Sequence, residues 1–245
     1  MNHVYFDHNA TTQLDARVLD AMLPWMSAQS GNPSSRHQFG RAAREAVAQA
    51  REQVARACGA QASQVVFTAS GTEANNLAIK GLANYVPQGQ ILSSAVEHPC
   101  VTRSAMAMRA HGHVAHSIPV DSDGKVDHAE MKAQLNQPTS LVSVMLANNE
   151  TGVLQDVAEL ADVARAHGSL MHTDAVQALG KIALNFNDLN VHAMTVSSHK
   201  LHGPQGAAAL ILDKRVDIQP LLHGGGQERG LRSGTENVAA IVGFG

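Results

Sequence analysis

Seven short apolar runs alternate with helical segments along this chain, and no other feature restricts the possible fold as strongly. The runs cover residues 64–70, 89–98, 113–121, 140–152, 169–180, 193–203 and 206–214. Several of them are apolar throughout, which is typical of strands that are buried on both faces of a sheet. Strands separated by helices at this spacing form βαβ units. The sequence therefore predicts an α/β fold with a mostly parallel, seven-stranded sheet covered by helices.

Polar clusters lie at the ends of five of these runs. They cover residues 68–73, 94–98, 147–152, 172–177 and 197–203. In a parallel sheet the ligand binds beyond the carboxyl ends of the strands. We therefore expect these five clusters to face one crevice.

The helical segments carry recognisable ends. Residues 15–29 have helical periodicity with Asp15 as the N-cap, and a long helix over 41–59 ends at Gly59, where glycine is favoured. The tetrapeptide Ser-Gly-Thr-Glu occurs at 70–73 and again at 233–236, each time before an apolar run. Ser-x-x-Glu in this position predicts a capping box, and helix N-termini also attract anions. We expect both copies to cap helices, and the alternative that both helices also bind one anion is open at this point.

Composition argues against several classes of function. A net charge of −3 and an aromatic content of 3% argue against nucleic-acid binding. The sequence shows neither a secretory signal nor an apolar run of about 18 residues, so we expect a cytoplasmic protein without a membrane span. Cys58 and Cys100 lack metal-ligand spacing, and His111, His113 and His116 have no cysteine or carboxylate beside them. We therefore expect no metal site, and packing roles for both cysteines.

Lys200 and Asp174 together indicate a particular cofactor. Alone, Lys200 is either a solvated loop lysine or a lysine that forms an imine. Asp174 ends an apolar run, where a buried carboxylate needs a cationic partner. Pyridoxal 5′-phosphate (PLP) requires both groups, a lysine for the imine and an aspartate that keeps the ring nitrogen protonated. The first Ser-Gly-Thr-Glu would hold the phosphate, with Gly71 allowing a close approach of the backbone.

Three further polar residues lie in the same clusters. His98 ends a strand. It is either a residue that stacks on the face of the PLP ring and takes part in acid–base catalysis, or a structural histidine. Asn149 and Gln177 either donate hydrogen bonds to the hydroxyl oxygen of the PLP ring or have ordinary structural roles. In the second case Asn149 belongs to a turn and Gln177 to a helix start.

Eight motifs, in this order, carry a resemblance to a known family: YFDHNATT, GNPSSRHQFG, SGTEANN, VEHP, NNETG, HTDAVQALGK, SSHKLHGPQG and GGGQERGLRSGTEN. Over essentially all 245 residues, the chain resembles the NifS/IscS-type cysteine desulfurases, which belong to the class V aminotransferase group of fold-type I PLP enzymes. SSHKLHGP and RSGTEN together are highly specific to this group. The resemblance implies the large domain of the fold-type I PLP-dependent transferases.

The resemblance implies a role for each matching residue. Lys200, which carries PLP, and His98, which stacks on its ring, are the implied catalytic residues. The implied cofactor-binding residues are Gly71, Thr72, His98, Asn149, Asp174, Gln177, Ser197, His199, Lys200 and, across a homodimer interface, Thr235. Asn32 is implied to line the pocket for the substrate carboxylate.

The implied reaction converts L-cysteine to L-alanine. Lys200 removes the Cα proton, and a cysteine thiolate of the enzyme takes the sulfur as a persulfide. The persulfide then serves an iron–sulfur scaffold or another sulfur-acceptor protein. Neither Cys58 nor Cys100 matches the family's nucleophile, which lies in the family's C-terminal part. We therefore expect the front part of a longer enzyme, able to bind PLP but inactive in desulfuration by itself.

The domain organisation follows from the same resemblance. We expect residues 1–14 to form an N-terminal segment associated with a small domain, and residues 15–245 to form the PLP-binding large domain. We expect the C-terminal small domain to be absent from this chain. A selenocysteine lyase, another class V PLP enzyme and a catalytically incomplete PLP-binding fragment remain alternatives at this point.

Overall fold

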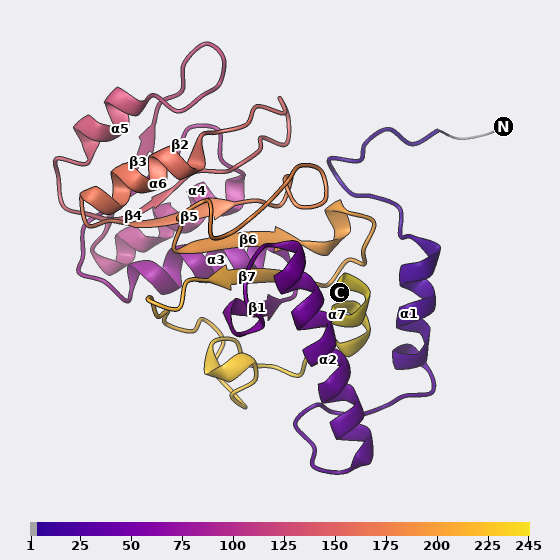
Figure 1. Ribbon diagram of the computed structural model, residues 1–245. Coiled ribbons are helices and arrows are strands. Elements are labelled where there is room, and N and C mark those ends of the chain that lie inside the picture. The colour runs from indigo at the N-terminus through magenta and orange to yellow at the C-terminus, as the bar shows by residue number, and fades with distance from the viewer. Residues whose placement is uncertain (1–3) are drawn as a thin grey trace.

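A seven-stranded sheet forms the centre of the computed structural model, which describes residues 4–245 (Figure 1). The strands are β1 (Val65–Thr68), β2 (Gln90–Ser94), β3 (Val114–Ile118), β4 (Thr139–Ser143), β5 (Leu170–Asp174), β6 (Ala193–Ser197) and β7 (Ala208–Leu212). They lie in the order β1-β7-β6-β5-β4-β2-β3. Neighbours from β3 to β6 are parallel, whereas β7 is antiparallel to β1 and β6. The predicted α/β fold with a mostly parallel, seven-stranded sheet is confirmed.

Helices cover both faces of this sheet. They are α1 (Ala16–Met26), α2 (Gln38–Ala57), α3 (Gly71–Ala83), α4 (Pro99–Ala107), α5 (His128–Gln134), α6 (Val157–Ala166) and α7 (Val238–Phe244), with short 3₁₀ turns η1 (Ala62–Gln64), η2 (Met108–His111), η3 (Ser198–Lys200) and η4 (Glu228–Gly230). None of the helices within 4–245 has the length and apolar character needed to cross a bilayer.

The two faces of the sheet are separated by the alternation of side chains along each strand. In β2, Ile91 joins the apolar cluster that contains α3 and α4, and its neighbour Leu92 joins the cluster that contains α2, α5, α6 and α7. Leu141 and Val142 divide in the same way in β4. Because consecutive side chains of a strand point to opposite faces, an apolar run without alternation needs helices on both sides, as observed.

Two of the predicted helix ends are confirmed by their hydrogen bonds. The Asp15 carboxylate accepts from the amide of Arg17 at 2.8 Å and caps α1. Helix α2 ends with Cys58 as its C-cap, followed by Gly59 in the left-handed conformation at a φ of +63°. Helix α2 begins three residues earlier than predicted, at Gln38, because the ring of His37 accepts from the amide of Gly40 at 3.3 Å and acts as the N-cap.

The two copies of Ser-Gly-Thr-Glu differ in structure. In the first, Ser70 Oγ accepts from the amide of Glu73 at 3.1 Å, and the Glu73 carboxylate accepts from the amide of Ala69 at 3.0 Å. The predicted cap at α3 is therefore confirmed. The prediction that the second copy caps a helix is wrong: α7 begins only at Val238, after the N-cap Asn237, whose side chain accepts from the amide of Ala240 at 3.1 Å.

The second copy stays outside α7 for two local reasons. Gly234 has a φ of +115°, which lies outside the helical region. Asparagine is also among the strongest N-cap residues, and Asn237 stands next to the apolar run. A motif alone therefore misplaced the start of this helix by several residues.

The loop before α7 is tied to the sheet by a buried ion pair. Both carboxylate oxygens of Glu228 accept from the Arg51 guanidinium of α2 at 2.6 Å, and Glu228 also accepts from the amide of Phe67 in β1 at 2.8 Å. The Glu228 side chain is 2% exposed and that of Arg51 is 15% exposed. Glu228 and Arg229 both adopt left-handed backbone conformations, with φ of +47° and +60°. Such conformations persist where surrounding contacts enforce them.

We expect Arg51→Ala to lower the free energy of unfolding by about 3–5 kcal/mol, because it leaves the Glu228 carboxylate buried without its partner. Denaturant unfolding would measure the loss. Arg17→Ala removes an exposed ion pair with Asp15, in which the Arg17 side chain is 91% exposed, and should leave stability nearly unchanged. Equal effects of the two substitutions would contradict this prediction.

Candidate active site

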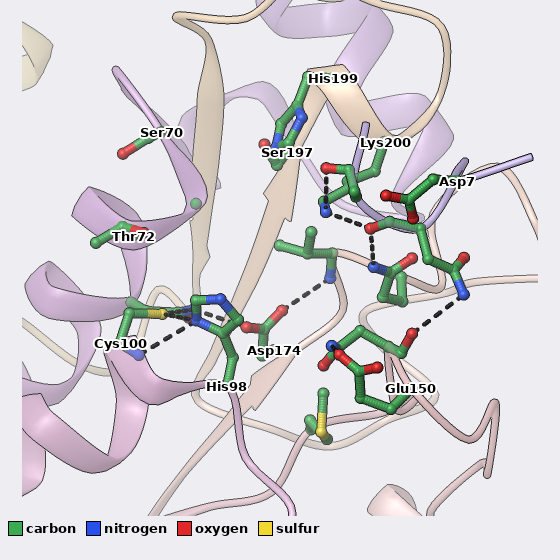
Figure 2. Close-up of a pocket in the computed structure, with 18 residues that line it drawn as sticks. Asp7, Ser70, Thr72, His98, Cys100, Glu150, Asp174, Ser197, His199 and Lys200 are labelled. Atoms are coloured by element: carbon green, nitrogen blue, oxygen red, sulfur yellow. Dashed lines mark hydrogen bonds between the residues drawn. The ribbon is translucent and has the colours of Figure 1, made fainter. Parts of the chain in front are cut away.

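A cavity of about 710 Å³ opens at the carboxyl ends of β2, β4, β5 and β6, beside the N-terminus of α3 (Figure 2). Its volume lies in the range of about 300–1,000 Å³ that is typical of small-molecule sites. The predicted site residues that line it are Gly71, Thr72, His98, Asn149, Asp174, Gln177, Ser197, His199 and Lys200. The five polar clusters therefore face one crevice, as the sequence predicts.

Asp174 is the buried acid of the cavity. It is the last residue of β5 and only 5% exposed. One carboxylate oxygen accepts from the amide of Val176 at 2.9 Å, and the other accepts from the Asn75 side chain at 2.7 Å. Burial raises the pKa of Asp174, and these two hydrogen bonds oppose the rise. Because Asp174 forms no ion pair within the described chain, a cationic ligand would stabilise its charge.

His172 supports Asp174 from within the sheet. It precedes Asp174 by two residues on β5, and its ring lies between Ser143 Oγ of β4 at 2.8 Å and Thr195 Oγ1 of β6 at 3.1 Å. Burial lowers the pKa of His172 to about 3, so its ring is neutral at ordinary pH. These contacts join three strands immediately before the point where Asp174 enters the cavity. His172 is not among the site residues that the sequence predicts.

Hydrogen-bond donors gather where α3 meets the end of β6. The capping box accepts hydrogen bonds from the amides of Ala69 and Glu73. The amides of Gly71 and Thr72, in the first turn of α3, receive no acceptor from this box. Ser197 Oγ is buried and has no partner in the described chain. A methyl group at Gly71 would lie 3.3 Å from Val176 Cγ2 and 3.5 Å from Ser197 Cβ, so glycine permits this close approach. Free amides, a free hydroxyl and a helix N-terminus together suit an anion.

Lys200 ends the short turn η3 that follows β6. Its Nζ donates to the backbone carbonyls of Asn9 and Ala10, the latter at 2.7 Å. Burial, together with the nearby charge of Lys181, lowers the pKa of Lys200. A partly buried amine with a lowered pKa is the form that suits imine chemistry.

Asp7, Asn9 and Ala10 of the N-terminal segment line the cavity, and no sequence pattern predicts this. Asn9 receives a hydrogen bond from Gln177 Nε2 at 3.0 Å and donates to the carbonyl of Asn149 at 3.1 Å. Thr12 donates through its amide to the carbonyl of His199 at 2.9 Å. No local signal indicates contacts so distant in sequence. The described part of the segment thus contacts the cavity. Its association with a small domain stays a prediction, and residues 1–3 lie outside the described chain.

Three further contacts concern predicted cofactor ligands. Lys181 Nζ donates to Gln177 Oε1 at 2.5 Å, which leaves the Gln177 amide group pointing to Asn9. The ring of His199 contacts Thr11 Oγ1 at 3.2 Å, and burial lowers the pKa of His199. The Asn149 side chain donates to the carboxylate of Glu150 at 2.6 Å. All these groups therefore have defined orientations.

Asn32 and Thr235 do not line this cavity. Asn32 forms a local turn in the loop before α2, where its side chain accepts from the amide of Ser34 at 2.9 Å. Thr235 lines a separate recess of about 50 Å³ together with Thr68, Ala69 and Gly206. Their predicted roles, at the substrate carboxylate and across a dimer interface, stay predictions.

The two cysteines occupy different environments. Cys58 is fully buried in the core, and burial raises its pKa to about 12. Cys100 lines the cavity, and partial burial raises its pKa to about 11. The packing role predicted for Cys100 is therefore incomplete, because its thiol also lies 2.9 Å from the His98 ring. Neither cysteine carries a significant fraction of thiolate near neutral pH.

Comparison with known proteins gives one consistent family. The profile of the family Aminotransferase class-V matches residues 4–245. Cysteine desulfurase IscS of Dictyoglomus turgidum is 44% identical over 244 residues, which cover 99% of this chain and 62% of that protein. A solved NifS-like protein is 40% identical with a TM-score of 0.95, covering 99% of this chain and 68% of that one. SspA in complex with cysteine is 36% identical with a TM-score of 0.94, covering 99% and 71%.

His172 should make the stability of the protein depend on pH. Its pKa of about 3 in the folded chain lies below the ordinary 6.5, so between these values the unfolded chain binds more protons and stability falls as pH falls. We expect His172→Gln to reduce the slope of the unfolding free energy by about 1.4 kcal/mol per pH unit between roughly pH 4 and 6. Urea unfolding at a series of pH values would measure this.

The exposed His116 provides a matched control, and His116→Gln should leave the slope as it is in the unmodified chain. A His172→Gln protein with the unmodified slope would show that His172 does not titrate on unfolding.

Proposed function

Because the chain belongs to the aminotransferase class-V family and is similar along its whole length to cysteine desulfurases, we propose that it is the PLP-binding part of such an enzyme. The chain spans about 62% of the length of the curated relative described above. One observation carries the proposal: the cavity holds a buried aspartate that has no ionic partner among residues 4–245, together with a lysine whose pKa is lowered. These are the acid and the amine that PLP requires.

The chemistry of the cavity fits this cofactor. Asp174 would pair with the ring nitrogen, Gln177 and Asn149 would bond the ring hydroxyl, and His98 would lie against the ring. The phosphate would be held by Ser197 Oγ, which has no partner in the described chain, and by the group Gly71, Thr72 and His199. When bound, PLP withdraws electrons from the Cα atom of an attached amino acid.

Lys200 would both attach the cofactor and move a proton. Its lowered pKa favours the neutral amine, which would attach to the cofactor aldehyde with loss of water. Once the substrate amine has displaced it, the same amine would accept the proton from Cα of the substrate. The Nζ atom donates hydrogen bonds to the carbonyls of Asn9 and Ala10, and these hydrogen bonds would have to break when Lys200 reacts. Asn9 and Ala10 would then hold the amine again after it is released.

We propose L-cysteine as the substrate and L-alanine as the product. The sulfur would pass to a cysteine thiolate, and the two cysteines of this chain are not suited to that step, because burial raises the pKa of both. The attacking thiolate would thus belong to another segment or chain. We further propose a cytoplasmic homodimer, in which Thr235 reaches the phosphate of the second subunit, and an iron–sulfur scaffold or other sulfur acceptor as partner.

We expect PLP to attach to Lys200 and to no other lysine. Borohydride reduction after addition of PLP would fix the bond, and mass spectrometry of peptides would locate it. Lys200→Ala should abolish the label. Lys181→Ala, which removes the neighbouring amine, should retain the label on Lys200. A label on Lys181, or no label in the unmodified chain, would overturn the proposed function.

We expect Thr235→Ala to weaken PLP binding by about tenfold or more in the dimer, because a hydrogen bond to a charged group is lost. Fluorescence titration would give the affinity, and analytical ultracentrifugation would give the oligomeric state. Dilution of the unmodified chain to monomers should weaken PLP binding by a similar factor. Unchanged affinity of Thr235→Ala in a proven dimer would exclude this role.

A further inference from the structure

A row of hydrogen-bonded side chains connects Asp174 with His98 along one wall of the cavity. Asn75 of α3, which is only 1% exposed, donates to Asp174 Oδ2 at 2.7 Å and to Cys100 Sγ at 3.1 Å. Cys100 Sγ in turn lies 2.9 Å from His98 Nδ1, and Figure 2 shows the thiol against the His98 ring. Asn75 follows Gly71 by four residues, so both lie on the face of α3 that meets the cavity.

The direction of these hydrogen bonds is set from the Asp174 end. The Asp174 carboxylate oxygen accepts from the amide nitrogen of Asn75, so this nitrogen faces Asp174. Its two hydrogens are then used, one on Asp174 Oδ2 and one on Cys100 Sγ. The Asn75 Oδ1 atom is buried without a partner in the described chain, so it offers no competing acceptor bond to the thiol.

Cys100 therefore accepts from Asn75 and keeps its own hydrogen to donate. Burial raises the pKa of the Cys100 thiol to about 11, so the hydrogen is present near neutral pH. His98 Nδ1 lies 2.9 Å from the thiol and can accept its hydrogen, and the Thr72 side chain is a further hydrogen-bond partner of the thiol. The amide of Cys100 also donates to Nδ1, at 3.2 Å, because His98 is the N-cap of α4. Two donors thus converge on one ring nitrogen.

We propose that Cys100 is a positioning residue that holds His98 in the tautomer with its hydrogen on Nε2, so that His98 offers this hydrogen to the cavity. A nitrogen that accepts two hydrogen bonds cannot carry the hydrogen of the neutral ring, which then resides on the other nitrogen. The backbone amide alone gives a weaker preference, because only one of the two hydrogen bonds to Nδ1 is left when the thiol is removed.

The significance of the tautomer for catalysis rests on the proposed function. A neutral His98 with its hydrogen on Nε2 donates to a group in the cavity and does not take up a proton there. The opposite arrangement is a Cys100 thiolate beside a doubly protonated His98, which would make Cys100 a nucleophile. The two arrangements differ in the number of hydrogens on the ring, and this number is measurable without cofactor or activity.

The test is nitrogen-15 NMR of the ring nitrogens in the cofactor-free protein at neutral pH, with His98 assigned from the spectrum of His98→Gln. The unmodified chain should show a protonated Nε2 and a bare Nδ1. Cys100→Ala should lower the ratio of the Nε2–H to the Nδ1–H form by about two- to tenfold, because one of two hydrogen bonds to Nδ1 is lost. Cys100→Ser should restore the ratio, because a hydroxyl also accepts and donates.

Cys58→Ala is the matched control, because it removes the other buried thiol from the core and should leave the His98 signals unchanged. A doubly protonated His98 with rapid alkylation of Cys100 by iodoacetamide would overturn the proposal. An Nδ1–H tautomer in the unmodified chain would also overturn the proposal, and this measurement does not depend on the folding of Cys100→Ala. An unchanged ratio of the two tautomers in folded Cys100→Ala would overturn it as well. Addition of PLP to the same samples tests the proposed function separately, because failure to bind leaves the tautomer result standing.

Discussion

A carboxylate held inside a sheet that is covered on both faces is the constraint on which this site depends. Asp174 stands at the end of β5, and burial raises its pKa against the effect of its two hydrogen bonds. The described residues around it supply fixed polar contacts but no positive charge in direct contact, so a cationic ligand would stabilise the carboxylate. The His172 contacts to β4 and β6 fix the strand that carries it. Lys200 reaches the same cavity because β6 is the parallel neighbour of β5.

The sequence predicted those parts of the molecule that local patterns specify. The seven strands, the polar strand ends and the first Ser-Gly-Thr-Glu cap depend on periodicity and on residues within one helical turn. The contacts of Asn9 and the position of Lys181 beside Gln177 depend on the tertiary fold, and no nearby residue indicates them. The position of Asn75 could have been predicted from the sequence, because Asn75 is four residues from Gly71 and therefore lies on the same face of the helix. The error at the second Ser-Gly-Thr-Glu arose because the motif competes with Asn237, a strong cap closer to the helix.

The two copies of that tetrapeptide are nevertheless connected. Arg232, directly before the second copy, forms an ion pair with Glu73 of the first copy at 2.7 Å, with both side chains largely buried. Glu73 thus caps α3 and also anchors the loop that carries Thr235. The buried pair of Arg51 and Glu228 holds the same loop against β1. The loop is therefore attached to the anion-binding end of α3 and to the sheet edge by charged groups, which fixes Thr235 near Ala69 at the surface recess.

The N-terminal segment has a consequence for the order in which the molecule is completed. Asn9 and Lys200, whose groups meet in the cavity, are 191 residues apart in the chain. At a synthesis rate of roughly 5–20 residues per second, Asn9 is synthesised about 10–40 s before Lys200. Closing so long a loop is slow compared with forming local helices. Asn9 is thus made long before it can reach its position, and the cavity stays uncovered on that side until β6 and its following turn exist.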